Sequence, residues 1–222
     1  MKPTALLVVL CAAVATAPAL AQAGAGAPVE VAALTAALRQ GGLIVYFRHT
    51  STDRADIAKE ARFRAAGELD IANCLTQRNL STEGHAEARE QAAIFRRLAL
   101  PMGEVLASRY CRAYGHARAF TPSFAYSEPL TPVRDKDKAQ ALRAMLARAP
   151  AAGTNTLMFA HGGILWEATD YDSIESETFV FRPGSPPQLL ASIRMEDWAR
   201  LARGSGTCCA PRAFWRGGAP AE

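Results

Sequence analysis

Three short, largely hydrophobic runs stand out along the chain, and each is followed at once by polar or charged residues. They cover Leu43–Phe47, Glu104–Ala107 and Thr156–Ala160. Runs of this length, bounded by glycines or polar residues, are typical of strands buried on both faces of a sheet. A final pair of strands is predicted at Thr178–Phe181 and Leu189–Arg194.

Between these runs, apolar residues recur at helical spacing. The spacing predicts helices at Val29–Arg39, from Ser81 to just before Pro101, and at Arg109–Phe120, Lys136–Ala149 and Glu196–Ala202. Strands that alternate with helices predict a mainly parallel sheet covered on both faces. Thr50–Ala72 and Ala113–Asp135 lack a recognisable recognition motif. We expect these two segments to be largely irregular and to determine which ligand binds.

The first residues have the pattern of a secretory signal peptide. Lys2 gives a positive start, Ala5–Ala17 is apolar, and small residues at Ala19, Ala21 and Ala23 offer cleavage sites. A retained membrane anchor would need about 20 apolar residues. We therefore expect residues 1–23 to be removed, residues 24–222 to form a single domain in the periplasm or outside the cell, and no stable membrane insertion.

Composition and charge narrow the class of protein further. Hydrophobic residues make up 50% of the chain, which indicates a packed globule rather than a disordered chain. The formal net charge is +4, and the basic residues are scattered rather than gathered in a stripe. This distribution argues against a nucleic-acid or membrane-surface partner. A modest excess of arginine suits a small anionic ligand.

Cysteine and histidine spacing bears on disulfides and metals. Cleavage would remove Cys11 and leave Cys74, Cys111, Cys208 and Cys209, an even number that permits disulfides in an exported protein. Three pairings remain open, although adjacent cysteines close an awkward small ring. No CxxC, HExxH or HxxxH spacing occurs. We therefore expect neither a zinc site nor any other cofactor.

Charged or reactive side chains follow each of the three predicted central strands. The first strand leads into Arg48-His49, the second into Ser108 and then Arg112, and the third into His161. In an open α/β sheet, ligands bind outside the carboxyl ends of the strands. If the strands are parallel neighbours, two histidines and two arginines meet in one pocket.

Such a pocket suits phosphoryl transfer. Two guanidinium groups can hold the oxygens of a phosphate. Flanking cations lower the pKa of a histidine and keep a nitrogen lone pair available for nucleophilic attack on phosphorus. A second histidine can donate a hydrogen bond to the equatorial oxygens, where charge spreads in the transition state.

Four sequence blocks together resemble the histidine phosphatase superfamily, in its phosphoglycerate-mutase-like branch and its small exported forms. The blocks are Phe47-Arg48-His49-Thr50, Asn79-Leu80-Ser81-Thr82-Glu83-Gly84, Leu106-Ala107-Ser108 through Arg112-Ala113, and Ala160-His161-Gly162. They span roughly residues 43–165. An Arg-His pair alone is a weak signal, whereas four blocks in this order are a strong one.

The resemblance implies a fold and a set of roles. The expected fold is a three-layer α/β/α sandwich with a mainly parallel central sheet. His49 is expected to be the nucleophile, Arg48, Arg112 and His161 to complete the phosphate pocket, and no metal to take part. The phytase branch carries a late His-Asp pair, whereas Gly162 follows the second histidine here.

The chain departs from the pattern of the family in several places. Thr50 stands where a glycine or very small residue is usual. The asparagine that related mutases carry soon after the Arg-His pair is missing, and Arg54 is the candidate replacement as a substrate contact. Glu128 matches best the glutamate that protonates the leaving alcohol, Glu167 is the alternative, and some small members use neither.

Other candidates have simpler explanations. His85 and His116 are expected to be exposed helix residues, and Trp166 and Trp198 to be packing residues. Arg78 could touch substrate or pair with a carboxylate, and the sequence does not separate the two. A bridge between Cys74 and Cys111 is plausible near the rim of the pocket, the alternative being two buried thiols.

Together these features predict an exported, monomeric or weakly dimeric phosphatase that hydrolyses a small phosphorylated substrate through a phosphohistidine. A phosphohistidine-protein substrate is a second possibility. The hypothesis from another class is a non-catalytic anion-binding protein of the cell envelope that retains the pocket.

Overall fold

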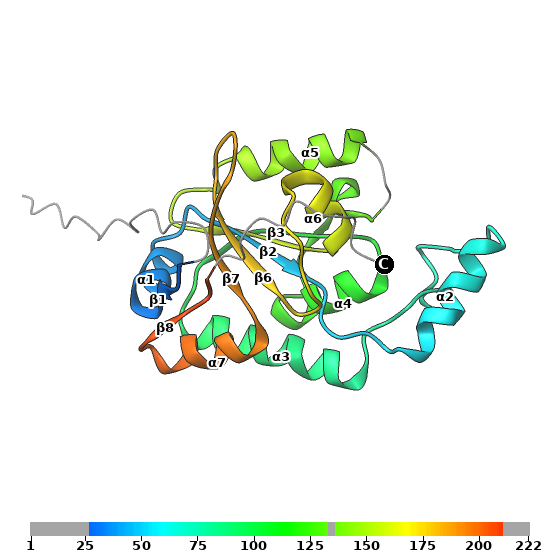
Figure 1. The fold of residues 1–222 in the computed structure, drawn as a ribbon, viewed down its shortest axis with the longest axis horizontal. Coiled ribbons are helices and arrows are strands. Elements are labelled where there is room, and N and C mark those ends of the chain that lie inside the picture. The colour runs from blue at the N-terminus through cyan, green and yellow to red at the C-terminus, as the bar shows by residue number, and fades with distance from the viewer. Residues whose placement is uncertain (1–26, 133–135, 211–222) are drawn as a thin grey trace, which may run out of the picture.

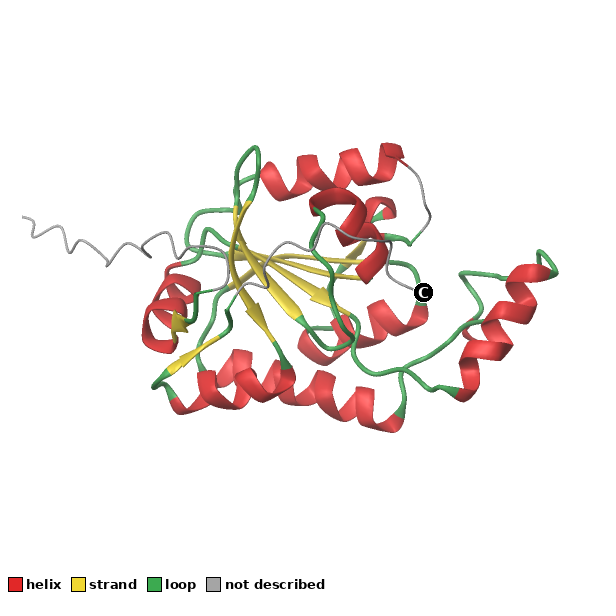
Figure 2. Ribbon diagram, viewed as in Figure 1, coloured by secondary structure: helices red, strands yellow, loops and turns green. Residues whose placement is uncertain are grey.

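A six-stranded central sheet with helices on both sides makes up most of the molecule (Figures 1 and 2). The computed structural model describes residues 27–132 and 136–210, so the predicted signal peptide lies outside the described residues. The helices are α1 Val31–Gln40, α2 Ala55–Ala65, α3 Thr82–Arg97, α4 Cys111–Phe120, α5 Lys136–Ala147, α6 Gly162–Thr169 and α7 Met195–Arg203, with short 3-10 helices η1 Cys74–Thr76 and η2 Glu128–Leu130. The strands are β1 Val29–Glu30, β2 Ile44–Arg48, β3 Met102–Ala107, β4 Ala125–Tyr126, β5 Asn155–Ala160, β6 Thr178–Arg182, β7 Gln188–Ile193 and β8 Thr207–Cys208.

The strand order of the central sheet is β4-β3-β5-β2-β6-β7. Its first four strands are parallel, β6 pairs antiparallel with β2, and β7 pairs antiparallel with β6. The three strands that lead into the candidate site residues, β3, β5 and β2, are therefore adjacent and parallel. This confirms the mainly parallel sheet, with an antiparallel hairpin added at one edge.

Alternate residues of β2 serve two separate hydrophobic cores. Val45 and Phe47 belong to one core, together with residues of α1, α3, α4 and α7. Ile44 and Tyr46 belong to the other, together with residues of α5 and α6. Figure 1 shows these two groups of helices on opposite sides of the sheet. Every β2 side chain in the two cores is at most 1% exposed, so the continuous apolar run is explained and the three-layer architecture is confirmed.

Most predicted helices and strands are present within a few residues of their predicted ends. The first helix begins at Val31 rather than Val29, because Val29 and Glu30 pair with Cys208 and Thr207. Trp198 is fully buried, as expected for a packing residue. No helix within the described ranges 27–132 and 136–210 has the length and hydrophobicity that crossing a membrane requires.

The prediction that Thr50–Ala72 is irregular was wrong. Helix α2 occupies residues 55–65 and projects from the rest of the molecule (Figure 1). Its alanines and Ile57 are exposed, and its one buried residue is Glu60. Alanine, lysine, glutamate and arginine, which fill most of α2, have high intrinsic helix propensity. Propensity rather than an apolar face therefore marks this helix.

The expectation that His116 is exposed was also wrong, whereas His85 is exposed as predicted. The His116 side chain is 0% exposed and lies 2.8 Å from the Gln91 amide oxygen. Its ring packs edge-on against Phe47 and Phe159. The small residues Ala113 and Ala117 on the same face of α4 bring this helix close to the sheet and enclose the imidazole.

Candidate active site

The candidate residues meet at the carboxyl edge of β2, β5 and β3. Arg48 ends β2 and is paired in register with Ala160 at the end of β5. The His49 amide donates to the Ala160 carbonyl at 3.0 Å, and the Ser108 amide donates to Phe159 at 2.9 Å. These bonds extend the parallel ladders just past the strand ends. They place the three polar segments side by side, as the topology requires.

His49 is neutral and its protonated nitrogen can be assigned. Its Nδ1 lies 3.0 Å from the Thr50 carbonyl, and because a carbonyl can only accept, Nδ1 donates and Nε2 carries the lone pair. Burial, followed by the nearby Arg112 and Arg48 guanidinium groups, lowers the pKa of His49 well below its usual value. An unprotonated, correctly oriented imidazole is the form that a nucleophile needs.

His161 faces His49 across the pocket, with 5.2 Å between the ring centroids. Its Nε2 lies 3.0 Å from the Ser108 hydroxyl. The Tyr46 hydroxyl donates to the His161 carbonyl at 2.8 Å and so fixes the backbone there. Burial, then Arg112, lowers the pKa of His161 well below its usual value. This second histidine is therefore also neutral.

Three buried nitrogens around this point have no hydrogen-bond partner in the described part of the chain. They are Arg48 Nε, Arg112 Nε and His161 Nδ1. Buried polar atoms are nearly always satisfied in native proteins, and leaving one without a partner costs about 1–3 kcal/mol. An anion with several oxygens placed between these side chains would satisfy them together.

Arg48 is held by the loop that follows α6. Its Nη1 donates to the Ser173 carbonyl and lies 3.4 Å from the Ser173 hydroxyl. A Cβ added to Gly162 would lie 2.6 Å from this nitrogen and 2.7 Å from the Ser173 hydroxyl oxygen. Glycine leaves room for the guanidinium at the start of α6, where a larger residue would displace the Arg48 or Ser173 side chain, and this accounts for the His-Gly pair in the sequence.

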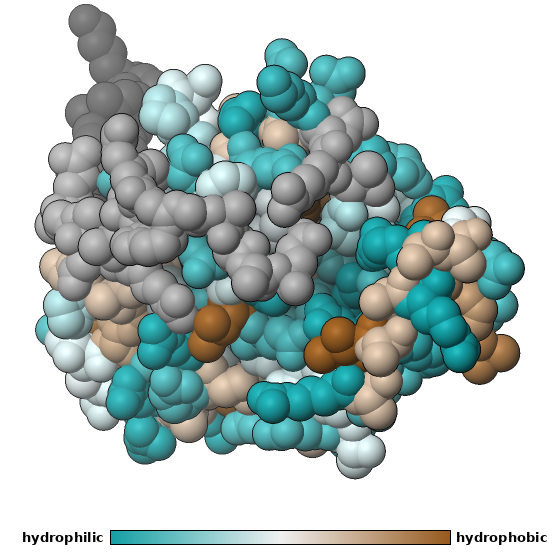
Figure 3. All heavy atoms as spheres, turned by 45° about the vertical axis from the view of Figure 1, so that its right-hand side comes forward, coloured by the Kyte–Doolittle hydropathy of each residue, from teal (hydrophilic) through white to brown (hydrophobic). Residues whose placement is uncertain are grey.

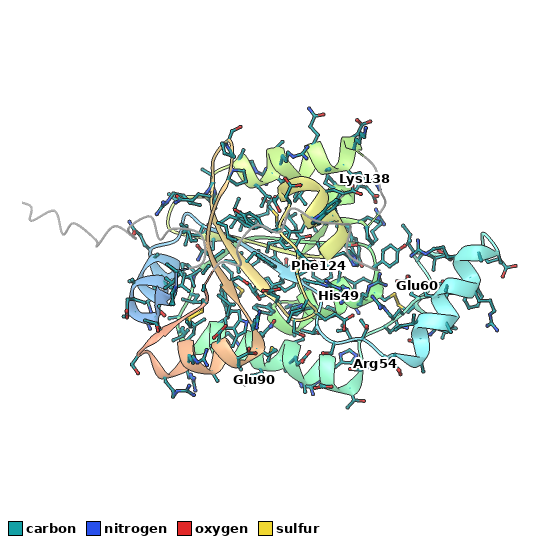
Figure 4. All side chains as sticks on the ribbon, in the orientation of Figure 1. His49, Arg54, Glu60, Glu90, Phe124 and Lys138 are labelled. Atoms are coloured by element: carbon teal, nitrogen blue, oxygen red, sulfur yellow. A yellow bond between two sulfur atoms is a disulfide. The ribbon has the colours of Figure 1, made fainter. Side chains whose placement is uncertain are left out.

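Glu60, the buried residue of α2, holds the Arg112 side chain and the Arg78 backbone. One Glu60 carboxylate oxygen accepts from Arg112 Nη1 at 2.9 Å and from the Arg78 amide at 2.6 Å. The other accepts from Arg64 at 2.9 Å. Burial alone would raise the pKa of Glu60, but Arg112 and the other donors outweigh it and lower the pKa. Figure 4 shows Glu60 on α2 and His49 near the end of β2.

Thr50, the departure from the family pattern, turns its side chain away from the pocket. Its hydroxyl donates to the Gly84 carbonyl at 2.8 Å. Ser81 caps α3 by accepting from the Gly84 amide at 3.0 Å, and a Cβ on Gly84 would lie 1.9 Å from the Ser51 carbonyl oxygen. The second sequence block thus forms a close contact between the start of α3 and the segment after His49.

Glu128, Glu167 and Arg54 have no recorded contact with the two histidines among the described residues. Glu128 pairs with Arg109 at 2.9 Å and with Lys138 at 3.7 Å, and its side chain is 57% exposed. Glu167 lines a separate pocket between α5 and α6. Arg54 is exposed at the start of α2 (Figure 4). The role of Glu128 as proton donor and that of Arg54 as substrate contact stay predictions.

Arg78, Glu60 and Glu175 were not placed in the site by the sequence. The Arg78 guanidinium lies 3.7 Å from a Glu175 carboxylate oxygen, so the pairing with a carboxylate that the sequence left open is present. Arg78 also lowers the pKa of His49 and therefore lies near the candidate site as well. Glu175 also accepts from the Thr52 amide at 3.0 Å. Of the three, only Arg78 carried a sequence signal, because it directly precedes the second block.

Cys74 and Cys111 form a disulfide that ties η1 to the start of α4. Cys111 directly precedes Arg112, and the Cys111 amide donates to the buried Gln77 side chain at 2.9 Å. The predicted bridge is therefore present and anchors the backbone that carries Arg112. A second disulfide joins Cys208 and Cys209.

One possible metal-binding group occurs among the described residues, and it does not include the pocket histidines. It consists of Asp197, Cys208 and Cys209. Because both sulfurs are in a disulfide, they offer no thiolate ligand. The Asp197 carboxylate already accepts from Arg200 at 2.5 Å. This cluster therefore does not provide a metal centre in the disulfide-bonded form.

The face of the molecule that carries α2 is mainly hydrophilic. Figure 3 shows this side, with hydrophobic residues in separate small patches. The large hydrophobic residues that are exposed in the described chain are Ile57, Leu75, Met102, Tyr126 and Ile174. A polar ligand suits this face better than a lipid or an apolar one.

Acid is expected to destabilise the domain from about pH 6.5 downward, because His49, His116 and His161 are all buried and neutral. Burial lowers the pKa of His116 to about 3. In the unfolded chain each histidine binds a proton below about pH 6.5, so the unfolded state gains protons and the free energy of unfolding falls. The slope should approach about 4 kcal/mol per pH unit for the three residues.

Urea denaturation at pH 7.5, 6.5, 5.5 and 5.0 measures this slope. The variant His85→Gln, which removes an exposed histidine, should leave it unchanged. A free energy of unfolding that stays constant from pH 7 to 5.5 would contradict the burial of three neutral imidazoles.

Comparisons with known proteins support the fold. No protein-family model matches the chain, and no curated protein matches it in sequence. Among solved structures, the protein histidine phosphatase SixA complexed with tungstate is similar, with a TM-score of 0.51 and 18% identity over 70% of this chain and 98% of that chain. A putative alpha-ribazole-5'-P phosphatase from Escherichia coli str. K-12 substr. MG1655 has a TM-score of 0.49 and 13% identity, over 67% of this chain and 95% of that one.

A phosphoserine phosphatase mutant from Entamoeba histolytica, in complex with phosphoserine, has a TM-score of 0.47 and 11% identity, over 70% of this chain and 98% of that chain. Of these three structures, the SixA structure is the one whose TM-score exceeds 0.5. The chain therefore has a three-layer α/β/α fold similar to that of this protein histidine phosphatase.

Proposed function

We propose that the protein is a phosphatase that hydrolyses phosphate monoesters through a phosphohistidine at His49, without a metal. The observation that carries the proposal is the set of three buried, unpartnered nitrogens on Arg48, Arg112 and His161 around a neutral His49. A phosphoryl group presents several oxygens to donors and an electrophilic phosphorus to a lone pair. A phosphoryl group therefore provides acceptors for the unpartnered nitrogens and an electrophile for the lone pair of His49.

In the first step, His49 Nε2 attacks phosphorus and a P–N bond forms. The P–O bond to the leaving group breaks, and the leaving oxygen takes a proton from Glu128, the predicted donor, to become an alcohol. Arg48 and Arg112 hold the equatorial oxygens, and His161 donates to them, so the charge of the transition state is balanced by fixed donors. In the second step, water attacks phosphorus, the P–N bond breaks, and inorganic phosphate leaves with His49 neutral again.

Glu128→Gln tests the predicted proton donor. Hydrolysis of an alkyl phosphate, whose leaving group is poor, should slow by about 10²-fold, because protonation of the leaving oxygen contributes about that much. Hydrolysis of 4-nitrophenyl phosphate should change less than about threefold, since its leaving group needs little protonation. Steady-state kcat values for both substrates measure the difference.

The matched control is Glu104→Gln, which removes an exposed glutamate paired with Arg148. Equal, small effects of both variants on both substrates would show that Glu128 is not the donor. Glu167→Gln would then be measured in the same way.

The covalent step is tested by rapid quenching into alkali after mixing enzyme with a ³²P-labelled aryl phosphate. A phosphohistidine survives alkali and is lost in acid, so a label with this behaviour should map to the peptide that contains His49. Labelling of another residue, or turnover with no labelled enzyme under single-turnover conditions, contradicts the proposed pathway. Binding of inorganic phosphate without any turnover would favour the non-catalytic anion-binding protein. Full activity after treatment with a chelator is expected from the proposed metal independence.

Export and a monomeric or weakly dimeric state belong to the same proposal. The pairing of all four cysteines of residues 24–222 supports an oxidising compartment. Expression with the full leader, followed by fractionation and N-terminal sequencing, should find a mature chain that begins close to Gly24 outside the cytoplasm. A chain recovered in the cytoplasm that still begins at Met1 would contradict export.

A further inference from the structure

A groove between α3 and α4 lies next to the phosphate pocket and has a volume of about 480 Å³. The two helices pack side by side on one face of the sheet (Figure 1). Asn79 and the Cys74–Cys111 disulfide line one end of the groove, and Leu80 and Ala88 are among its apolar lining. Tyr114 lies beside the disulfide, with its hydroxyl 2.9 Å from Cys74 Sγ.

The ionisable side chains that line the groove, apart from that of Tyr114, are all basic. They are His85, Arg89 and Arg118, and no aspartate or glutamate is among the described lining residues. Arg118 stacks on the Tyr114 ring at 4.9 Å, and neither arginine has a recorded ion pair in the described chain. Within residues 27–132 and 136–210, the hydrogen-bond partners of the Tyr114 hydroxyl are the two disulfide sulfur atoms, which are weak partners. The groove therefore offers donors for an anionic group.

The groove and the phosphate pocket share a wall made of consecutive residues. Arg78 and Arg112 face the pocket and lower the pKa of His49, whereas their chain neighbours Asn79 and Cys111 line the groove. Arg118 lies six residues along α4 from Arg112. At 1.5 Å per residue, the two guanidinium-bearing positions are separated by about 9 Å along the helix axis.

From this juxtaposition we infer that the groove binds a second anionic group of the substrate whose phosphate occupies the His49 pocket. The preferred substrate then carries another phosphate or carboxylate at a fixed distance from the phosphate that is hydrolysed. Arg89 and Arg118 would bind this group as paired forks, which suit the planar or trigonal oxygens of carboxylate and phosphate. The inference rests on the proposed function for its first subsite and extends it to a substrate class.

A series of alkanediol bisphosphates with four to ten carbons serves as a molecular ruler, and each is compared with the alkyl monophosphate of the same length. We expect kcat/KM for the bisphosphates to pass through a maximum at an intermediate length and to exceed that of the matched monophosphate about tenfold, which corresponds to about 1.4 kcal/mol. The double variant Arg89→Gln/Arg118→Gln should lose this advantage. Its kcat/KM for the monophosphates should stay within twofold of wild type.

Arg97→Gln/Arg203→Gln is the matched control, because it removes two exposed arginines that are outside the groove. It should keep the advantage of the bisphosphates, since it changes the net charge equally and so corrects for long-range attraction. An advantage that is independent of length, or that both double variants reduce equally, would overturn the second subsite.

Calorimetric titration with the same bisphosphates and monophosphates separates this inference from the proposed function. A preference in binding that depends on length and on the two arginines, without any turnover, supports the subsite and contradicts the phosphatase. Turnover of monophosphates without such a preference supports the phosphatase and contradicts the second subsite. Phosphotyrosine peptides with glutamate or glutamine three residues from the phosphotyrosine identify the source of the second anion. Faster hydrolysis of the glutamate peptide that is lost in Arg89→Gln/Arg118→Gln indicates a polypeptide substrate. Equal hydrolysis of the two peptides by the wild type indicates a small molecule.

Discussion

Replacement of His49 by alanine is expected to lower kcat for 4-nitrophenyl phosphate by about a thousandfold or more, because it removes the group that forms the bond to phosphorus. The Arg48 and Arg112 side chains and His161 Nδ1 remain, and their unpartnered nitrogens are the proposed phosphate donors. Inorganic phosphate should therefore still bind, with an affinity within about tenfold of wild type. Phosphate release and calorimetric phosphate titration measure the two quantities on the same protein.

Two control variants make this result specific. His85→Ala removes an exposed histidine and should keep wild-type kcat. Arg48→Ala should weaken phosphate binding as well as turnover, because it removes one of the unpartnered nitrogens. If His49→Ala hydrolysed the aryl phosphate as fast as wild type, His49 could not be the nucleophile, whatever the affinity for phosphate.

The central part of the site could be predicted because it depends on strand ends. Arg48-His49 and His161 directly follow fully buried apolar runs, and parallel neighbouring strands bring such positions together. The sequence alone does not state that β2 and β5 are neighbours, but the alternation of strands and helices makes a parallel arrangement the expected one. His49 and His161 are 112 residues apart in sequence, yet the fold leaves their rings 5.2 Å apart.

The surroundings of these residues could not be predicted, because they depend on side chains from irregular or polar segments. Glu60 and Arg112 are separated by 52 residues, and nothing in the apolar pattern around residue 60 indicates a buried position. His116 was misassigned for a related reason. Its burial follows from the packing of α4 against Phe47 and Phe159, and a histidine next to alanines in a helix has no sequence signature for such a contact.

The wrong prediction for residues 50–72 has a functional consequence. A helix that buries only a glutamate gains little from hydrophobic packing, so its position depends on polar contacts. The Asn79 amide donates to Asp56 at 3.2 Å, and the Arg78 and Arg112 groups donate to Glu60. The ordering of α2 is therefore coupled, through one carboxylate, to the orientation of the Arg112 guanidinium and to the position of the Arg78 backbone.

Glu60→Ala is expected to lower the free energy of unfolding by about 3 kcal/mol, the usual cost of breaking a buried ion pair by removal of one partner. The Arg112 side chain is only 5% exposed and would keep its charge without a carboxylate. Loss of its orientation should also reduce kcat/KM for an aryl phosphate by roughly tenfold or more. Amide hydrogen exchange in residues 55–65 should accelerate, because α2 loses its buried anchor.

Arg64→Ala is the matched comparison, because it removes the exposed partner of the same carboxylate and leaves the bond between Glu60 and Arg112 in place. It should cost less than about 1 kcal/mol, as exposed ion pairs usually do, and should leave kcat/KM unchanged within about twofold. Glu60→Gln keeps an acceptor for Arg112 but not the negative charge. Its free energy of unfolding and its kcat/KM should therefore lie between those of Glu60→Ala and Arg64→Ala. If Glu60→Ala unfolded no more easily than Arg64→Ala, and α2 exchanged at the wild-type rate, Glu60 would be neither the anchor of α2 nor the support of Arg112. The phosphate pocket would then depend on the sheet edge alone.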